Sequence, residues 1–177
     1  MNRPSLLACA AVALALPACT TVDDMSSETL AAATMSRANG APAGTVELVA
    51  NGDRLSLVVA ATGLPQGAHG FHLHTTGTCT APDFTSAGGH LNPTNNNHGT
   101  MSPGGSHLGD LPNLTVGSSS VTTSTIELAD TNRSQVLDWL FDADGTAVVI
   151  HQDPDDYKTD PSGNAGPRIA CGVLERT

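Results

Sequence analysis

Aromatic and basic side chains are scarce in this sequence. One Trp, one Tyr and three Phe occur among 177 residues, so a hydrophobic core must be built mainly from Val, Leu, Ile and Ala. Lys and Arg together number seven against 17 Asp and Glu, which gives a formal net charge of −10. An acidic chain of this kind is poorly suited to bind nucleic acid or an anionic membrane surface, and we expect neither as a partner.

Long apolar runs are missing beyond the N-terminus. No stretch after residue 19 is apolar enough to span a membrane. Within residues 1–18, Arg3 precedes a short apolar run at residues 6–16, a pattern typical of an export signal. The run closes with Leu-Pro-Ala-Cys, which resembles a bacterial lipobox in which Cys19 becomes the lipidated first residue. Ordinary cleavage near Ala18, which would leave Cys19 as an idle thiol, is the alternative.

Export defines the expected compartment and the expected domain. Removal of residues 1–18 deletes one basic residue and no acidic one, so the mature chain carries a net charge of −11. We expect residues 19–28 to form a polar tether and residues 29–177 to form one domain with one core. The expected location is the periplasm or cell envelope, with the membrane contacted only through an N-terminal lipid.

Cysteine is also infrequent, with four in the whole chain. Cys9 lies inside the signal and Cys19 at its end, so Cys79 and Cys171 remain in the domain. A distant pair of cysteines in an oxidising compartment usually forms a disulfide. Two separate buried thiols are the alternative.

Short strands with alternating apolar residues dominate the rest of the sequence. Residues 44–50 place Val46, Leu48 and Ala50 on one face, and a turn at residues 51–53 leads into a second alternating segment. The pattern predicts eight strands, at residues 30–36, 44–50, 54–60, 70–74, 114–117, 121–128, 145–151 and 168–174. Only residues 136–141 could form a helical turn. The sequence therefore predicts an all-β sandwich or barrel.

Two long segments, residues 75–111 and 152–167, carry no strand pattern and are rich in Gly, Pro, Asn, Asp and Ser. Loops of this length inside a compact domain are usually functional or disordered. All seven histidines lie between His69 and His151, in these loops or next to them. We therefore predict that both loops are functional.

The histidines have the spacing and chemistry of metal ligands. Residues i and i+2 of a strand point to the same side, so His72 and His74 can face one ion. His151 ends an apolar strand, and imidazole binds both copper and zinc. Three further histidines and one aspartate match the ligands of tetrahedral zinc: His90, His98, His107 and Asp110. These seven residues are too few for two separate four-ligand sites, but one imidazole shared through both of its nitrogens completes both.

Four motifs carry a resemblance to a known family. They are GFHLH at residues 70–74, AGGHLNP at 87–93, GDLPNL at 109–114 and GNAGPRIACGV at 163–173. With them the chain resembles the copper–zinc superoxide dismutases of the bacterial exported type, over residues 29–175. The resemblance implies an eight-stranded Greek-key β-sandwich or flattened barrel with two long functional loops. It also implies dismutation of superoxide to oxygen and hydrogen peroxide, with copper cycling between Cu(II) and Cu(I).

The resemblance assigns a role to each matching residue. It makes His72, His74 and His151 copper ligands, His90 the bridging imidazolate that also assists catalysis, and His98, His107 and Asp110 zinc ligands.

Further roles follow from the same motifs. Cys79 and Cys171 match the internal disulfide, and Asp155 matches a carboxylate that links a copper histidine to a zinc histidine. Arg168 matches the arginine that guides the substrate, and His69 a structural histidine that ties loops together.

A non-enzymatic protein that holds copper or zinc at the cell surface is the alternative function. It would need the ligands but neither Arg168 nor an open copper position, so the presence of Arg168 and Asp155 favours the enzyme.

Lys158 could add to the positive charge near the copper. Residues 75–78 replace the segment that forms the dimer interface in eukaryotic members, so both a monomer and a homodimer remain open. Residues 81–85 are an insertion relative to the eukaryotic pattern.

Overall fold

The computed structural model describes residues 27–128 and 132–177. The strands are β1 (Glu28–Arg37), β2 (Pro42–Asn51), β3 (Arg54–Thr62), β4 (Gly67–His74), β5 (Asp110–Val116), β6 (Val121–Glu127), β7 (Ala147–His151), β8 (Arg168–Val173) and β9 (Glu175–Arg176). The helical elements are the 3-10 turn η1 (Thr85–Ala87) and the helix α1 (Arg133–Leu140). In the described part of the chain, no helix has the length and apolar character needed to cross a membrane. The predicted signal and Cys19 lie outside the described residues.

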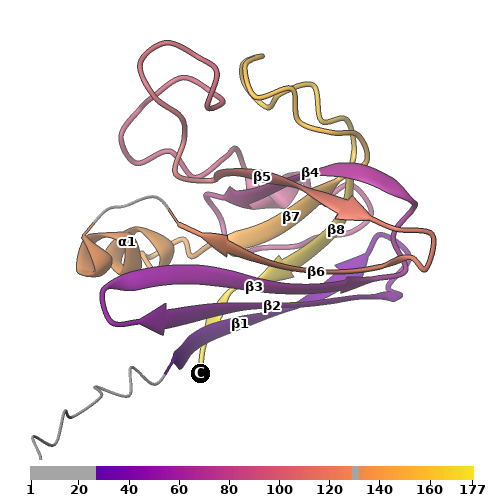
Figure 1. The fold of residues 1–177 in the computed structure, drawn as a ribbon, viewed down its shortest axis with the longest axis horizontal. Helices are drawn as coiled ribbons and strands as arrows, with labels where there is room; N and C mark the ends of the chain where they lie inside the picture. Colours follow the sequence, from indigo (N-terminus) through magenta and orange to yellow (C-terminus); the bar gives the residue numbers. More distant parts are fainter. Residues whose placement is uncertain (1–26, 129–131) are drawn as a thin grey trace, which may run out of the picture.

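The strands form one antiparallel sheet in the order β5-β4-β7-β8-β1-β2-β3-β6, and β9 adds to β1. β5 and β6, at the two ends of this order, lie close together, so the sheet curls into a nearly closed, flattened barrel (Figure 1). The β3–β4 and β6–β7 connections join strands that are not neighbours in the sheet, which is typical of Greek-key topology. The predicted all-β fold is confirmed.

Alternation along β4 and β7 separates residues that face the apolar interior from residues on the outer face, where the histidines lie. Phe71 and Leu73 belong to the barrel core, as do the alternating apolar residues of β2 and β3. His72 and His74 therefore face outward, yet both are buried. The cover is provided by the two long loops, which rise from the β4, β7 and β8 side of the barrel (Figure 1). The barrel thus supplies a rigid floor for the histidines, and the loops shield them from water.

Among the differences from the predicted elements, three concern the start of β5, a helix and an added strand. β5 begins at Asp110, four positions before the predicted residue 114, so the last zinc-ligand candidate starts a strand. The possible turn at residues 136–141 is a helix of eight residues, capped by Asn132, whose side chain accepts a hydrogen bond from the Ser134 amide. The short β9 was not predicted. Its two residues pair with β1.

Candidate metal centre

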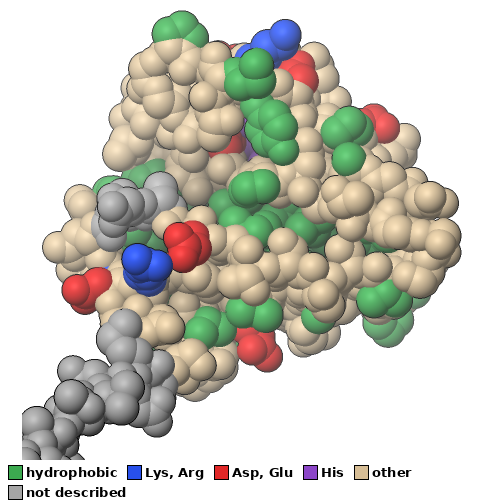
Figure 2. Space-filling view, viewed as in Figure 1, with side chains coloured by type: hydrophobic (Ala, Val, Ile, Leu, Met, Phe, Trp, Pro, Cys, Tyr) green, Lys and Arg blue, Asp and Glu red, His purple; other side chains and the backbone are tan. Residues whose placement is uncertain are grey.

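Four histidines meet on the outer face of β4 and β7. His72 and His74 come from β4, His151 ends β7, and His90 reaches them from the first loop through a β-bridge with His74. One ring nitrogen from each lies within 4.8 Å of the others, and all four side chains are buried. On the face shown in Figure 2 almost no histidine surface is visible. We call these four residues the nitrogen cluster.

The unpartnered ring nitrogens of the nitrogen cluster fit a metal ion. Each ring has one buried nitrogen without a hydrogen-bond partner: His72 Nδ1, His74 Nε2, His90 Nε2 and His151 Nε2. Buried polar atoms are normally paired, because an unpaired one loses its hydrogen bonds to water without replacement. Four such atoms aimed at one centre, all from a residue type that ligates copper, match the nitrogen donor set of a copper ion.

The opposite ring nitrogens are held by the protein. His72 Nε2 lies 2.7 Å from Asp155 Oδ2, His74 Nδ1 is 3.0 Å from the Gly88 carbonyl, and His151 Nδ1 is 3.0 Å from the Gly166 carbonyl. Each of these acceptors requires a ring N–H, which leaves the lone pair on the other nitrogen. The surrounding backbone and Asp155 therefore fix the tautomers that metal binding needs.

A second cluster, which we call the mixed cluster, shares His90 with the first. His90, His98, His107 and Asp110 have ligand atoms within 4.8 Å of one another. The Nδ1 atoms of the three histidines lie 2.7, 2.9 and 3.0 Å from the single oxygen Oδ1 of Asp110. One carboxylate oxygen cannot accept three well-aligned hydrogen bonds from ring N–H groups. These three short distances therefore fit a cation bound between the atoms better than hydrogen bonds. Three imidazoles and a carboxylate suit tetrahedral zinc.

Asp155 joins the two clusters from the second loop. Its Oδ2 pairs with His72 of the nitrogen cluster, and its Oδ1 lies 3.0 Å from Nε2 of His98 in the mixed cluster. Asp155 thus contacts one ring of each cluster, and His72 is its partner in the nitrogen cluster. Gly163 is required beside it, because a Cβ at that residue would overlap Asp155 Oδ1.

Burial keeps the cluster imidazoles neutral in the metal-free protein. Removal from water, followed by the charge of His90, lowers the pKa of His74 to about 2. Burial, followed by the charge of His72, lowers the pKa of His151 to about 3. For His90, burial outweighs the hydrogen bond to Asp110, and the pKa falls to about 4. Neutral rings at physiological pH have lone pairs available for a metal.

The carboxylates of the site are held ionised. Burial alone would raise the pKa of Asp110, but hydrogen bonds from His90 and from the Gly99 amide outweigh it and lower the pKa to about 2. Burial also opposes ionisation of Asp155, and the hydrogen bonds from His72 and His98 hold its pKa well below the usual range. Both groups therefore carry negative charge next to the histidines of the two clusters.

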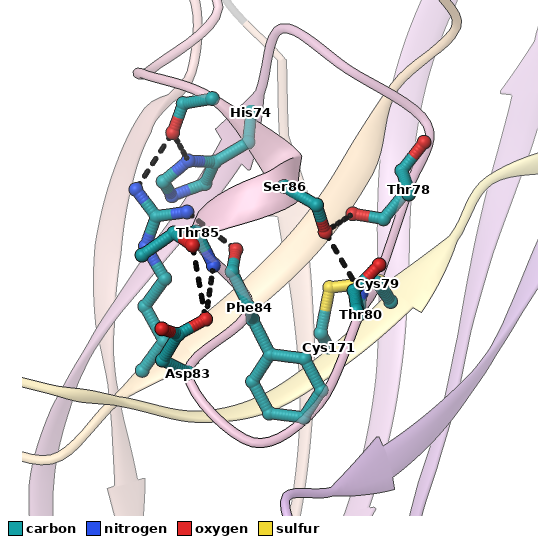
Figure 3. The surroundings of a disulfide bond; sticks show 11 residues. His74, Thr78, Cys79, Thr80, Asp83, Phe84, Thr85, Ser86 and Cys171 are labelled. Carbon is teal, nitrogen blue, oxygen red and sulfur yellow. Dashed lines mark hydrogen bonds between the residues drawn. A yellow bond between two sulfur atoms is a disulfide. The ribbon is translucent and has the colours of Figure 1, made fainter.

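Arg168 lies beside the nitrogen cluster. It begins β8, and its guanidinium donates to the carbonyls of Phe84 and Gly88, each at 2.6 Å. The Gly88 carbonyl also accepts from His74, so the guanidinium and a cluster ring share one acceptor (Figure 3). His69 is in neither cluster, and its ring nitrogens contact the carbonyls of His151 and Pro65.

The predicted disulfide is present. Cys79 and Cys171 are bonded, with their Cα atoms 5.7 Å apart. Cys171 is on β8, the strand that carries Arg168, so the bond ties the first loop to that strand (Figure 3).

Sequence analysis missed the residues that hold Asp155 and the backbone of His98 in place. The Asn113 side chain accepts from the Asp155 amide at 2.8 Å and donates to its carbonyl at 2.9 Å. The Tyr157 hydroxyl accepts from the Asn113 amide at 2.9 Å. Asp160 accepts from the His98 amide at 2.8 Å. The position of Asn113 inside the GDLPNL motif was the available signal.

Fold and site together define an all-β protein with two adjoining metal-binding clusters that share one histidine. The sequence model described as copper/zinc superoxide dismutase (SODC) matches residues 42–174. A copper–zinc superoxide dismutase of Aquifex aeolicus is 43% identical over 138 residues, which is 77% of this chain and 82% of that protein. The chain therefore belongs to the copper/zinc superoxide dismutase family. The activity that follows is dismutation of superoxide, with copper and zinc as the metals.

Solved structures agree with this assignment. A crystal structure of a superoxide dismutase-like protein from Bacillus subtilis superimposes with a TM-score of 0.75 at 38% identity, and the match covers 81% of this chain and 97% of that one. The Cu/Zn superoxide dismutase of Brucella abortus has a TM-score of 0.66 at 27% identity, over 85% and 100% of the two chains.

Proposed function

We propose that superoxide dismutation takes place at the nitrogen cluster, with copper held by His72, His74, His90 and His151. Zinc would be held by the mixed cluster. The observation that carries this proposal is the set of four unpartnered buried nitrogens that face one centre. Bound copper would supply the one-electron redox couple that dismutation requires, which zinc lacks.

His90 is the residue that belongs to both clusters. Its Nδ1 faces Asp110, and its Nε2 is one of the four unpartnered nitrogens. Formation of hydrogen peroxide from superoxide consumes protons, and His90 Nε2 is a nitrogen inside the site that could hold one whenever it is not bound to copper. Asp110 fixes the orientation of the ring, so that the proton is held on the side of the nitrogen cluster.

Arg168 would attract and orient the anionic substrate. The whole chain is strongly acidic, but salt screens charges beyond about 8 Å, so the local field near the site matters more than the net charge. The guanidinium shares the Gly88 carbonyl with His74 and is therefore next to the ligands. A non-enzymatic metal-binding protein would have no use for a cation at this position, which favours catalysis over the alternative.

Metal analysis together with a superoxide-consumption assay tests this assignment. Purified protein should hold about one copper and one zinc per chain, the number that seven ligands with one shared imidazole can bind. His151→Ala should lose copper and nearly all activity while it keeps zinc, because His151 belongs only to the nitrogen cluster. His107→Ala is the matched variant and should lose zinc first. Full activity in copper-loaded His151→Ala would show that copper binds elsewhere.

We further propose that the protein is exported to the periplasm or cell envelope and anchored through a lipid on Cys19. The support is the sequence pattern at residues 1–19, which lies outside the described residues. The several acyl chains of a bacterial lipoprotein hold firmly to a membrane, whereas a single chain is marginal. Cys19→Ser should move the protein from the membrane fraction to the soluble fraction. Wild-type protein that is fully soluble after export would favour ordinary cleavage near Ala18.

A further inference from the structure

The two acceptors that hold Arg168 belong to one short segment, residues 84–88, which contains the turn η1. The guanidinium has no acidic partner within salt-bridge distance among the described residues, and it donates instead to the carbonyls of Phe84 and Gly88. Its direction therefore depends on where this backbone lies. Any residue that fixes the segment also fixes the cation that faces the substrate.

Phe84 has an unusual conformation for its residue type. Its φ of 56° lies in the left-handed region, which is sterically unfavourable for a bulky side chain. A conformation of this kind persists only when surrounding contacts impose it, and such residues tend to occur at functional sites.

The contacts that impose it come from the ring of Phe84. The side chain is 2% exposed and packs with Ala87, Ala147, Val149 and Cys171 in a small cluster separate from the barrel core. Ala147 and Val149 are on the outer face of β7, and Cys171 is on β8. The ring thus fastens the loop to the strands that also carry His151 and Arg168 (Figure 3).

The polar contacts around Phe84 fix its backbone further. Its amide donates to the Thr80 carbonyl at 3.0 Å, and its carbonyl accepts from the Ala87 amide at 3.1 Å as well as from Arg168. Asp83 accepts from both the amide and the hydroxyl of Thr85, at 3.1 and 2.9 Å. The carbonyl of Phe84 therefore points at Arg168 because the ring is buried on one side and the turn is closed on the other.

We propose that Phe84 is a positioning residue for Arg168: its buried ring holds the two carbonyls that aim the guanidinium at the substrate. This inference rests on the proposed role of Arg168 in attracting superoxide. Phe84 belongs to neither cluster and acts only through the backbone of residues 84–88.

The first test measures the order of the Arg168 side chain directly. In zinc-loaded, copper-free protein, the NMR order parameter of the Arg168 Nε–H bond should fall in Phe84→Ala and fall less in Phe84→Leu, which retains a buried apolar group. Leu64→Ala is the matched control, because Leu64 is equally buried but lies in the barrel core away from the loop. It should leave the order of Arg168 unchanged. If Phe84→Ala does not fold, the result for Phe84→Leu is used instead. An unchanged order parameter of Arg168 in Phe84→Leu would then overturn the proposal.

The second test asks whether Phe84 acts through Arg168. Azide serves as a small anionic probe, and its dissociation constant is followed by the visible absorption of the copper-loaded protein. Phe84→Ala should raise this constant about tenfold, the low end of what one hydrogen bond to a charged group contributes. In an Arg168→Ala background the same change should have no further effect. If Phe84→Ala raised the azide dissociation constant equally in both backgrounds, Phe84 would be a core residue that does not act through Arg168.

The two tests separate this inference from the proposed function. If Arg168→Ala leaves azide affinity and the rate of superoxide consumption unchanged, the guiding role of Arg168 is wrong. The NMR measurement still decides whether Phe84 positions the Arg168 side chain.

Discussion

Each histidine of the nitrogen cluster has one ring nitrogen tied to a protein acceptor and one that faces the cluster centre. The acceptors differ: carboxylates for His72 and His90, and backbone carbonyls for His74 and His151. A carboxylate makes the opposite nitrogen a stronger electron donor than a carbonyl does, so the four ligands are not equivalent. These two rings, His72 and His90, are also the ones connected to the mixed cluster. Their carboxylate partners, Asp155 and Asp110, both contact His98 as well.

Arg168 offers the most direct test at the residue scale. Arg168→Ala should keep both metals and the fold but lose roughly 10- to 100-fold in kcat/KM, the range expected for one hydrogen bond to a charged group. Arg168→Glu should lose more, since attraction becomes repulsion. Raising the ionic strength should slow the wild type more than Arg168→Ala, because salt screens an attraction that the variant already lacks. A fully metallated Arg168→Glu protein as fast as the wild type would exclude the guiding role.

At the scale of elements, the site is built where two loops meet over β4, β7 and β8. The first loop supplies His90, His98 and His107, while the second supplies no ligand and contributes Asp155. Asp155 is therefore the second-loop side chain that contacts a histidine ring of each cluster. Asn113 on β5 holds the Asp155 backbone by two hydrogen bonds, so the position of the carboxylate is set by the barrel as well.

Asp155→Asn should weaken zinc binding without removing a ligand. An amide oxygen can accept from one ring, but its NH₂ group cannot accept from the other, so one of the links to His72 and His98 is lost. Loss of such an outer hydrogen bond typically costs about 10- to 100-fold in metal affinity. Competition with a zinc chelator measures this change.

Asp156→Asn is the matched control for that experiment. It removes the same charge from the neighbouring residue, whose carboxylate contacts Thr159, Lys158 and Asn164 and none of the histidines. Equal zinc affinities in the two variants would mean that loop charge, and not the link between the clusters, sets the affinity.

The members of the two clusters could be picked out from the sequence because their signals are local. His72 and His74 alternate on one strand, and His90, His98, His107 and Asp110 follow within one loop. The support of Asp155 could not be found in this way, since its partner Asn113 is 42 residues away. The start of β5 was missed because Pro112 interrupts its pattern. The carbonyls that hold Arg168 were missed because every residue has a backbone carbonyl, so residue types do not indicate which carbonyls accept its hydrogen bonds.

For the whole molecule, the arrangement divides the buried groups into two kinds. The barrel interior is apolar and built almost entirely from aliphatic side chains, as the scarcity of aromatics requires. The outer face of β4 and β7 instead buries histidines and a carboxylate under the loops. Metal-free protein therefore folds around several neutral imidazoles that would gain protons if they were exposed to water, and its stability is linked to pH.

The metal-free protein should lose stability as the pH falls from about 7 to 5. In the folded state the pKa values of His74, His90 and His151 are lowered to about 2, 4 and 3, whereas an unfolded histidine titrates near pH 6.5. Below about pH 6.5 the unfolded chain takes up protons that the folded chain does not, so protonation favours unfolding. The stabilisation is complete above pH 6.5 and is lost as the pH approaches the folded values. Each of the three groups contributes up to about 1.4 kcal/mol per pH unit to this loss.

Urea unfolding with a chelator present, at several pH values between 5 and 7.5, measures the slope. His151→Asn keeps a donor for the Gly166 carbonyl but removes one titrating group, so its slope should be shallower by about a third. Protein loaded with copper and zinc should resist the same pH change better, because the ions occupy the nitrogens that protons would otherwise take. An unfolding free energy of the metal-free wild type that is the same at pH 5 and pH 7 would show that these rings are hydrated, and not buried, when the metals are absent.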